Sequence, residues 1–431
     1  MTYKEARVYL DEVSKYGSVL GLDTIRGLLR ELGNPQDDLK FIHIAGTNGK
    51  GSVLAYTSTI LSEAGYRTGR YVSPTVVSYL ERIQVDGKWI PEEEFAGLVE
   101  EVQKAIARME TLGEASPTVF EVETAIAFLY FKKMNCDIVV LETGLGGTLD
   151  ATNIVENTVA AVFASISRDH MGFLGETLKE IAGNKAGIIK PGCFVVTAQQ
   201  KAEVMEVLKG KADELSCMMY TADSREADVT KEGWDGQRIT YGKWKDVEVA
   251  LAGRYQVTNA VTVLRLMEGL NDHGIVVSEK AVRDGFAKAV WPGRFTCISR
   301  QPLFIIDGAH NEEAALRLRE TVERYFSEMK LTFIMGVFKD KEYDKIAQIM
   351  APLAEKIYTI DLPDEGRTLK AEALKKAVDP YCADVEAVAD IKAAVGRAYE
   401  SAKDEDVILA FGSLSYLGQV MELVEQRKEK S

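Results

Sequence analysis

The chain has 431 residues, of which 46% are hydrophobic, and its formal net charge is −14. A chain of this length is expected to fold into two or three domains. The acidic balance argues against nucleic acid as the main partner, because a phosphate backbone needs clustered lysine and arginine. No apolar run approaches the roughly 18 residues that span a bilayer, and the five cysteines are scattered without a C-x-x-C pair, as in a reducing compartment. We therefore expect a cytoplasmic monomer that has no membrane partner.

Two short helices are expected within residues 1–34, before Pro35. An apolar run from Phe41 then leads into the loop Gly46-Thr47-Asn48-Gly49-Lys50-Gly51-Ser52, and residues 53–64 are expected to form a helix. A strand, a glycine-rich loop and a helix N-terminus form a cradle for phosphate. In it Lys50 would neutralise phosphate oxygens and Ser52 would help to hold Mg²⁺.

The spacing of this loop departs from G-x-x-x-x-G-K-[ST], because Gly51 separates the lysine from the serine. A glycine-rich turn without a ligand is the alternative. The lysine in the loop and the strand-like run before it favour phosphate binding.

Strands and helices alternate through the rest of the first half of the chain. Strands are expected at 67–72, 136–141, 158–166 and 194–197, and helices at 91–112, 118–133, 202–209 and up to residue 189. This alternation predicts a parallel sheet with helices on both faces, and ligands then lie beyond the carboxyl ends of the strands. Ser73, Glu142, Asp169 and His170 all fall at such ends. Each could be a polar loop residue or a helix cap, but their shared placement predicts a common cleft.

The pattern changes between residues 215 and 250, where short alternating runs predict a small antiparallel patch. Helices are expected at 253–270 and 278–289, and Trp291-Pro292-Gly293-Arg294 then breaks the pattern. A second alternation follows, with strands expected at 303–306, 331–335, 356–360 and 406–410 and helices at 312–329, 343–353, 369–378, 391–401 and 414–424. We therefore predict an α/β protein with a P-loop domain over 1–296 and a Rossmann-like α/β domain over 297–431. The second domain has no G-x-G-x-x-G, so we do not expect it to bind a dinucleotide.

Of the four histidines, two are expected to be structural and a third to be a metal ligand. His43 lies inside an apolar strand and is expected to be a core residue, and His273 is expected to cap a helix end. His170 and Glu142 are plausible ligands of a divalent ion beside a nucleotide. A hydrogen bond to another ligand is the alternative for His170.

The fourth histidine, His310, lies in the run Asp307-Gly308-Ala309-His310-Asn311 directly after a strand of the second domain. Asn311 is expected to cap the next helix, with two glutamates in its first turn. That explains the loop but not Asp307 and His310, which we expect to be exposed at the carboxyl end of the strand and functional.

The motifs described so far occur in one order with two further ones, Lys185-Ala186-Gly187-Ile188 and Pro292-Gly293-Arg294-Phe295. Together with Glu142-Thr143-Gly144-Leu145-Gly146-Gly147, they make the chain resemble the folylpolyglutamate synthases of the Mur ligase superfamily, including the bifunctional dihydrofolate synthases. The resemblance covers residues 20 to 417 approximately, and the inserted Gly51 is how this family writes its P-loop. It implies a P-loop central domain of the Mur ligase type followed by a C-terminal Rossmann-like domain.

The resemblance also implies a role for each matching residue. The expected ATP-binding residues are Thr47, Asn48, Gly49, Lys50, Gly51, Ser52, Asn259, Arg294 and Asp307. Two Mg²⁺ ions would be held by Ser73, Glu142 and His170. Folate or pteroate would lie against Leu20, Gly21, Leu22, Asp23, Phe120, Asp150, Ala151 and Thr152, and L-glutamate against His310 and Ser413. The expected catalytic residues are Lys50, Lys185 and His310.

Lys185 has two different interpretations. The residue pattern alone places it on a helix surface, whereas the resemblance implies a lysine carbamylated by CO₂. The sequence departs from the family pattern at Thr75, Thr148, Asn184 and Glu312. None of these changes removes an expected metal or phosphate contact.

The implied activity is the ATP-dependent addition of L-glutamate to the carboxylate of a folate, or of 7,8-dihydropteroate, through an acyl phosphate. Another Mur-type ligase would act on a nucleotide-linked muramyl substrate, but the segment before Phe41 is too short for a domain that binds a UDP-sugar. A non-catalytic ATP-binding switch and a simple kinase are further alternatives. The loop from Asp307 to Asn311 argues against both, because it provides a place for a third substrate.

Overall fold

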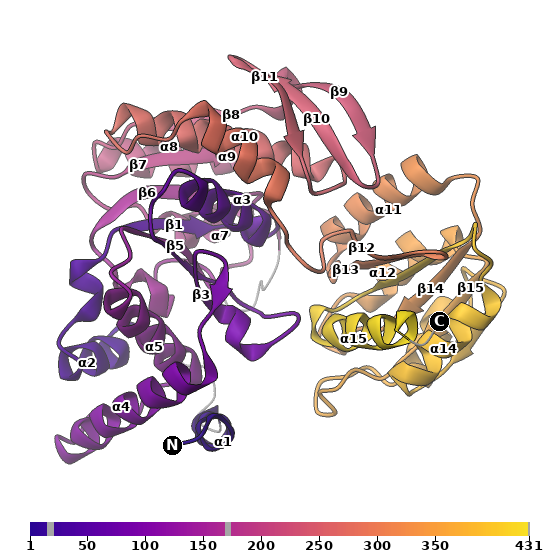
Figure 1. The fold of residues 1–431 in the computed structure, drawn as a ribbon, viewed down its shortest axis with the longest axis horizontal. Helices are drawn as coiled ribbons and strands as arrows, with labels where there is room; N and C mark the ends of the chain where they lie inside the picture. The colour runs from indigo at the N-terminus through magenta and orange to yellow at the C-terminus, as the bar shows by residue number, and fades with distance from the viewer. Residues whose placement is uncertain (15–20, 169–173, 430–431) are drawn as a thin grey trace.

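The structure is a computed structural model that describes residues 1–14, 21–168 and 174–429. The expected α/β architecture is confirmed: the described chain forms an eight-stranded sheet, a three-stranded sheet and a six-stranded sheet (Figure 1). The first sheet has, in spatial order, β4 (Lys88–Trp89), β3 (Ile83–Val85), β2 (Thr68–Tyr71), β5 (Ile138–Glu142), β1 (Phe41–Ala45), β6 (Thr158–Phe163), β7 (Phe194–Ala198) and β8 (Met219–Ala222). The strands from β2 to β8 are parallel, and β3 and β4 add an antiparallel edge.

The central strands β1 and β5 are buried along their whole length. Such continuous apolar, β-branched runs are typical of a parallel sheet that is covered on both faces. Helices α3 (Lys50–Glu63), α9 (Tyr255–Asp272) and α10 (Glu279–Lys288) form the core on one face. The other face carries α1 (Tyr3–Val13), α2 (Asp23–Glu31), α4 (Glu92–Thr111), α5 (Val119–Lys133), α7 (Leu178–Ala186) and α8 (Ala202–Glu214).

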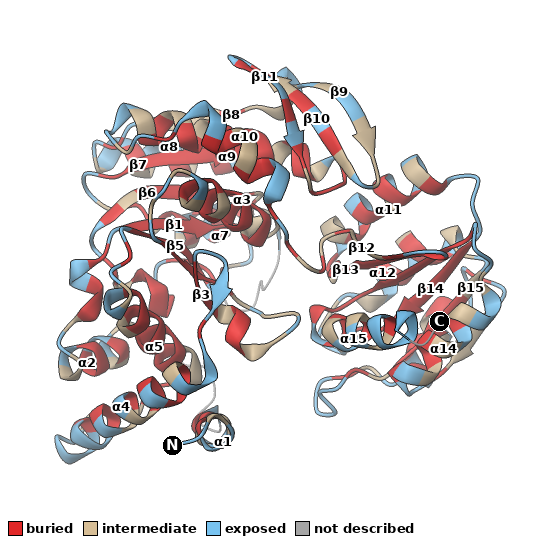
Figure 2. Ribbon diagram, viewed as in Figure 1, coloured by how far each residue is buried: buried red, intermediate tan, exposed pale blue. Residues whose placement is uncertain are grey.

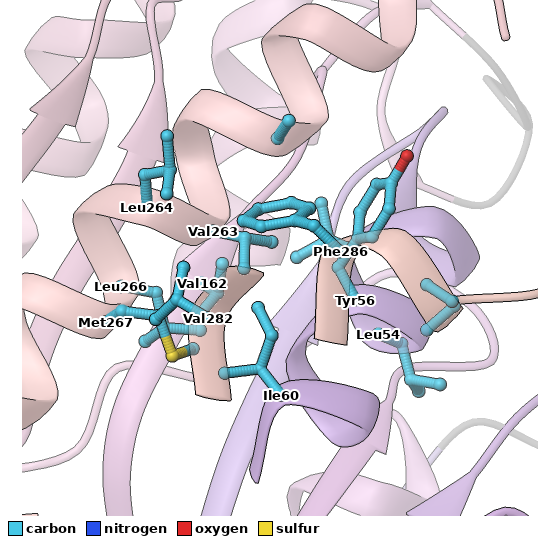
Figure 3. Close-up of a cluster of buried hydrophobic side chains, with 14 of the residues drawn as sticks. Leu54, Tyr56, Ile60, Val162, Val263, Leu264, Leu266, Met267, Val282 and Phe286 are labelled. Carbon is cyan, nitrogen blue, oxygen red and sulfur yellow. The ribbon is translucent and has the colours of Figure 1, made fainter. Parts of the chain in front are cut away.

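Apolar packing fixes α3, the helix that follows the glycine-rich loop. Figure 3 shows Tyr56 and Ile60 of α3 in one cluster with Phe286 and Val282 of α10 and Met267 of α9. All of them are fully buried. Removing such a side chain costs about 2–5 kcal/mol, so the helix that presents the loop is held rigidly.

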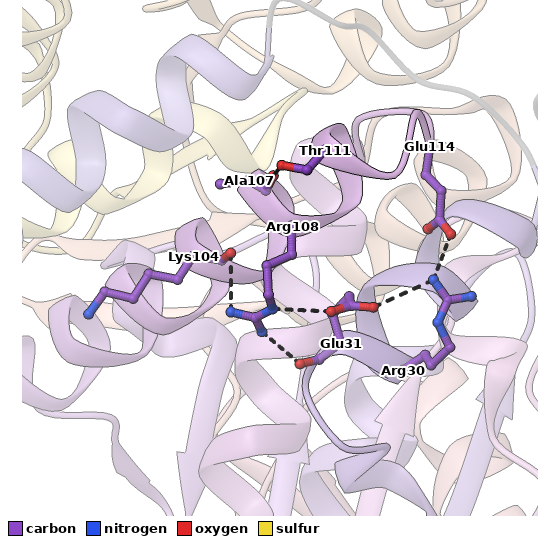
Figure 4. A network of polar contacts seen from close by, with 7 residues as sticks. All are labelled: Arg30, Glu31, Lys104, Ala107, Arg108, Thr111 and Glu114. Carbon is purple, nitrogen blue, oxygen red and sulfur yellow. Dashed lines mark hydrogen bonds and ion pairs between the residues drawn. The ribbon is translucent and has the colours of Figure 1, made fainter.

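Polar contacts join α2 to α4 on the outer side of the molecule (Figure 4). Arg108 Nε lies 3.1 Å from Glu31 Oε2, and Arg30 Nη2 lies 2.6 Å from Glu114 Oε1. Both arginines are about half exposed. Exposed ion pairs contribute about 0–1 kcal/mol each, so this network orients α2 more than it stabilises the fold.

The six-stranded sheet follows the three-stranded sheet of β9 (Asp228–Gly233), β10 (Gly236–Tyr241) and β11 (Trp244–Val249) in the chain. Its order is β12 (Thr296–Arg300), β13 (Leu303–Asp307), β17 (Val407–Phe411), β14 (Leu331–Met335), β15 (Lys356–Thr359) and β16 (Val385–Ala387), with β12 antiparallel and the others parallel. One face packs on α11 (Glu312–Phe326), α12 (Tyr343–Met350) and α13 (Ala371–Val378), and the other on α14 (Ile391–Ser401) and α15 (Leu417–Lys428). Figure 2 shows the strands of both large sheets buried and the outer faces of helices such as α4 exposed.

Several local expectations were wrong. The antiparallel patch was expected from residue 215, but Met219–Ala222 is β8, a parallel edge strand of the first sheet. The short strands β3, β4, β12 and β16 were not expected, because two to five residues carry too little periodicity to be detected. β6 ends at Phe163 and α7 at Ala186, three residues before the expected ends at 166 and 189. The described residues include no helix long and apolar enough to cross a membrane.

Candidate active site

The glycine-rich loop lies at the carboxyl end of β1 and leads into the first turn of α3. Gly49 precedes this helix with φ +90°, a left-handed conformation that favours glycine. A Cβ at this position would lie 2.5 Å from Asn259 Oδ1. The glycine therefore lets the loop approach α9, and Asn259 is placed beside the loop as expected.

Two lysine ammonium groups converge on one carbonyl of this loop. Lys50 Nζ donates to the Gly46 carbonyl at 3.3 Å, and Lys185 Nζ donates to the same oxygen at 2.9 Å. The side chain of Lys185 is buried, with 3% of its surface exposed. The placement of Lys185 on a helix surface, which the residue pattern alone predicts, is therefore wrong: helix α7 turns this residue inward against the loop.

Glu142 and Ser73 lie side by side at the ends of β5 and β2. The Ser73 backbone N–H donates to Glu142 Oε2 at 3.3 Å, and Lys50 Nζ lies 3.9 Å from Glu142 Oε1. Burial raises the pKa of Glu142, and the nearby Lys50 opposes this shift.

A carboxylate and a hydroxyl are oxygen donors of the kind that Mg²⁺ prefers, with phosphate and water as its other ligands. The described residues therefore fit a magnesium site at Glu142 and Ser73. No three His, Cys, Asp or Glu side chains gather as a metal cluster within residues 1–14, 21–168 and 174–429. His170, the third expected ligand, lies outside the described residues, as does Asp169.

The hydroxyl of Ser52 is held by a buried amide that the motifs did not reveal. Gln256 Nε2 donates to Ser52 Oγ at 3.0 Å, and Asn259 Nδ2 donates to Gln256 Oε1 at 2.9 Å. Gln256 and Asn259 are three residues apart on α9 and therefore lie on the same face of that helix. This spacing was a signal in the sequence that Gln256 belongs with Asn259.

The second sheet brings its own loop to the P-loop. Asn48 Nδ2 donates to Glu313 Oε2 at 3.0 Å, and Ser165 Oγ donates to Glu313 Oε1 at 3.2 Å. Asn311 Nδ2 also donates to Asn48 Oδ1 at 3.3 Å. Asn311 caps α11 as expected, by accepting a hydrogen bond from the Ala314 N–H. The N-terminus of α11 therefore contacts the phosphate loop, and Glu313 is a site residue that the sequence analysis missed.

A cleft of about 1390 Å³ lies between these elements. It brings together most of the expected ATP-binding positions, and its lining includes Asn48, Gly49, Ser52, Asn259, Arg294 and Asp307. Residues next to both large sheets thus line one space. Ser73 and Glu142, for which a common cleft with the P-loop was expected, do not line it.

Asp307 organises the loop at the end of β13. Its carboxylate accepts hydrogen bonds from the backbone N–H groups of Phe295 and Ala309, both at 2.8 Å. Only 5% of its surface is exposed, so the expectation of an exposed Asp307 was wrong. Burial raises the pKa of Asp307, and the charge of Arg294 opposes this shift.

His310 and Ser413 lie on neighbouring loops, outside the lining of the cleft. His310 Nδ1 lies 2.8 Å from the Gly308 carbonyl oxygen. A Cβ at Gly308 would lie 2.2 Å from Leu414 Cδ2, so the loop after Ser413 packs directly on the loop that carries His310. Ser413 Oγ accepts from the Ser415 N–H at 3.3 Å and begins the short helix at residues Leu414–Tyr416.

The expected folate segments gather on the face of the first sheet that carries α2 and α5. The ring of Phe120 and the side chain of Leu22 pack against the apolar cluster that contains Ala151. A Cβ at Gly144 would lie 2.5 Å from Phe120 Cζ, so this ring lies against the loop after Glu142. Gly21 and Asp23 lie at the start of α2. Leu20 lies outside the described residues.

Asp150 and Thr152 hold this region together from inside. Asp150 Oδ2 accepts a hydrogen bond from the Leu145 N–H at 2.7 Å. Thr152 Oγ1 lies 2.9 Å from His43 Nε2, and both side chains are fully buried. His43 is thus the core histidine that was expected, and burial lowers its pKa to about 3. His273 Nδ1 lies 2.7 Å from the Gly269 carbonyl oxygen and caps α9, also as expected.

Comparison with known proteins agrees with this geometry. The sequence matches the Mur ligase middle domain over residues 44–267 and the Mur ligase glutamate ligase domain over residues 293–414. It is 33% identical to the dihydrofolate synthase/folylpolyglutamate synthase of Bacillus subtilis, over 97% of this chain and 98% of that protein. The folylpolyglutamate synthase of Thermotoga maritima has a similar structure, with a TM-score of 0.86 and 33% identity over 99% of this chain and 97% of that one. Mycobacterium tuberculosis folylpolyglutamate synthase complexed with ADP gives a TM-score of 0.88 and 29% identity, over 98% and 99% of the two chains.

A P-loop sheet, a second α/β sheet and a cleft lined by both define a Mur ligase, which is an ATP-dependent ligase. Within that class the chain belongs to the folylpolyglutamate synthase/dihydrofolate synthase family. The resemblance seen in the sequence is thereby confirmed.

Proposed function

We propose that the chain adds L-glutamate to the carboxylate of a reduced folate or of 7,8-dihydropteroate, with ATP as the source of energy. One observation carries the proposal: the P-loop and the loop after β13 meet in a single cleft, through the contacts of Glu313 with Asn48 and Ser165. A site that only bound ATP would not need the second sheet at its phosphate end.

The chemistry starts from a carboxylate, which is a poor electrophile. A substrate carboxylate oxygen attacks the γ-phosphorus of ATP, and the bond from that phosphorus to the bridging oxygen of ADP breaks. Lys50 is placed to neutralise the charge on the transferred phosphoryl group. Mg²⁺ bound at Glu142 and Ser73 would supply further charge neutralisation on the phosphates.

The second step joins the amine. The nitrogen of L-glutamate attacks the acyl carbon, phosphate leaves with the electron pair of the broken C–O bond, and the amine loses a proton. His310 would position glutamate or accept this proton, and Ser413 on the neighbouring loop would contact the same substrate. The two substrates must be brought together by closure of the two sheets, with Arg294 at the junction.

Lys185 takes part as a carbamate in this proposal. Its neutral amine would add to CO₂ with loss of a proton, which converts a cation into an anionic oxygen ligand. The side chain of Lys185 is buried at the phosphate loop, where Nζ lies 2.9 Å from the Gly46 carbonyl oxygen. ¹³C NMR of the protein in ¹³CO₂ would show a carbamate signal that a Lys185→Arg variant lacks.

The remaining expectations belong to the same proposal. All five cysteines are free thiols, which suits a reducing compartment such as the cytoplasm. The substrates are small molecules, with no need for nucleic acid or a membrane. We expect a monomer, which light scattering of the purified chain would test.

Release of ADP tests the function directly. We expect release that depends on L-glutamate together with either tetrahydrofolate or dihydropteroate, and comparison of the two acceptors assigns the preferred one. Absence of glutamate-dependent release with both acceptors would overturn the proposal.

A further inference from the structure

Trp291, the first residue of the junction between the two large sheets, lies directly on the P-loop helix. Gly51 is the glycine inserted between Lys50 and Ser52 in the first turn of α3. An ideal Cβ on Gly51 would lie 2.5 Å from Trp291 Cζ2 and 2.7 Å from both Cε2 and Nε1. Such distances are shorter than any real carbon contact, so the indole occupies the space that a side chain at position 51 would need.

Other contacts also hold the indole of Trp291 in place. Trp291 is 6% exposed and belongs to the same apolar cluster as the helices α3, α9 and α10. The guanidinium carbon of Arg70, on β2, lies 4.7 Å from the centre of its ring. Buried cation–π contacts of this kind contribute about 2 kcal/mol. Trp291 therefore contacts the first turn of α3 and the strand β2, which leads to Ser73.

The junction continues from Trp291 to the loop of the second sheet. Two residues further on, the Gly293 carbonyl accepts a hydrogen bond from the Gly308 N–H at 2.8 Å. A Cβ at Gly293 would lie 2.9 Å from Leu414 Cδ2, and one at Gly308 would lie 2.2 Å from the same atom. A short stretch of chain thus contacts the phosphate loop at one end and the loops of His310 and Ser413 at the other.

We propose that Trp291 is a positioning residue, which holds the P-loop helix in register with the second sheet through its contact with Gly51. The inference rests on the proposed function, since the two loops must act on one acyl phosphate. It also gives the inserted glycine a steric reason: any side chain at position 51 would displace the indole and with it the junction. Trp291 itself need not touch a substrate.

A double-mutant cycle tests this contact. Gly51→Ala, Trp291→Ala and the double variant are compared with the original protein by calorimetric titration with Mg²⁺ and ADP, which needs neither folate nor glutamate. We expect Gly51→Ala to weaken ADP binding by about tenfold or more, because displacement of the first turn of α3 misaligns the backbone N–H groups that bind the phosphates. In the double variant the new methyl group fills the space left by the indole, so ADP should bind no more weakly than in Trp291→Ala alone. If the loss of ADP affinity in the double variant instead equals the product of the fold-losses in the two single variants, the two positions act independently and the proposal is wrong.

Turnover measurements distinguish a positioning role of Trp291 from a role in stability alone. Trp291→Ala should lower kcat for glutamate-dependent ADP release by about tenfold with a smaller change in KM for ATP, and Trp291→Phe, which keeps an aromatic ring, should recover part of it. Equal kcat in the original protein and Trp291→Ala would overturn the role. Urea unfolding identifies variants that fail to fold. If Trp291→Ala fails to fold, kcat of Trp291→Phe is compared with that of the original protein instead.

Two controls match the substitutions. Gly97→Ala lies on α4, where no atom is within 4 Å of the added Cβ, and Trp89→Ala removes a tryptophan that is 42% exposed. Neither should change ADP binding or kcat. Because ADP binding is measured without the other substrates, failure of the cycle contradicts the role of Trp291, whereas lack of glutamate-dependent turnover in the original protein contradicts the proposed function.

Discussion

The loop after β1 and the loop after β13 both follow a buried parallel strand, but different interactions build them. At the first loop, two lysine side chains donate to one carbonyl and a buried carboxylate faces them, so charged groups point at the site. At the second loop, the carboxylate of Asp307 accepts hydrogen bonds from the backbone N–H groups of Phe295 and Ala309 and so serves to hold the loop itself.

This difference assigns different tasks to the two loops. Concentrated charge of the first kind suits an anionic substrate such as a triphosphate. A loop whose conformation is fixed by internal hydrogen bonds suits recognition of a substrate by its shape. Substitutions at the first loop should therefore affect binding and chemistry, and substitutions at the second loop should affect stability and activity together.

The largest effect is expected for Lys50→Ala. Its Nζ lies between the Gly46 carbonyl and Glu142, so its loss removes a cation from the phosphate loop and a countercharge from the buried carboxylate. We expect glutamate-dependent ADP release to fall by about a thousandfold or more, as on loss of a group that stabilises transition-state charge. Lys104→Ala is the control, because this exposed lysine pairs with Glu100 on α4, away from the loop. Near-normal turnover of Lys50→Ala would show that the P-loop does not bind the phosphates.

Asp307→Asn should have the next largest effect. The amide can accept only one of the two backbone N–H groups, and an unpaired buried N–H costs about 1–3 kcal/mol. We expect urea unfolding to show this loss together with reduced turnover. Asp361→Asn is the control: Asp361 also accepts a backbone N–H, from Ala371 at 2.7 Å, but it does not line the cleft. If both variants keep full turnover, the loop after β13 has no part in the reaction.

Much of this arrangement followed from the sequence because its signals are local. The order of strands and helices, the P-loop and the cap at Asn311 each depend on residues close together in the chain. The inward orientation of Lys185 did not follow, because it depends on where α7 packs against the loop after β1, more than a hundred residues away in the chain.

The same limit explains the missed site residues. Glu313 looked like an ordinary acidic residue of a helix first turn, which it also is. Its partners Asn48 and Ser165 belong to the other sheet, and no local pattern predicts contacts between two sheets. The buried state of Asp307 was missed for a similar reason, because two of its hydrogen-bond donors, the Phe295 N–H and the Tyr255 hydroxyl, come from other segments of the chain.

A third prediction concerns His43, the neutral histidine buried in the first sheet. His43 lies directly before the loop, and its pKa of about 3 is below the 6.5 of an exposed histidine because burial disfavours the imidazolium ion. The unfolded chain therefore binds a proton that the folded chain does not bind between these two values. The free energy of unfolding should fall as the pH falls from 6.5 towards 3, by up to about 1.4 kcal/mol per pH unit from this residue.

Urea unfolding of the original protein and of His43→Gln from pH 7 to pH 4 measures this contribution. We expect the two curves of free energy against pH to converge as the pH falls, because the variant lacks the histidine that the unfolded protein protonates. Parallel curves for His43→Gln and the original protein would contradict the buried neutral histidine.

The smallest effect is expected at the contact between the two loops. The Glu313 carboxylate accepts hydrogen bonds from Asn48 and Ser165, so a negative charge lies where the phosphate loop opens into the cleft. Triphosphate must enter against this charge, and removing it should tighten ATP binding. We expect Glu313→Gln to lower KM for ATP by about threefold, which corresponds to a screened interaction of about 0.7 kcal/mol. Glu312→Gln is the matched control one residue away, because Glu312 is exposed and pairs with Lys345. A higher KM for ATP in Glu313→Gln would mean that the carboxylate helps to hold the nucleotide site closed around ATP. Both loops would then contribute to ATP binding, and not the first loop alone.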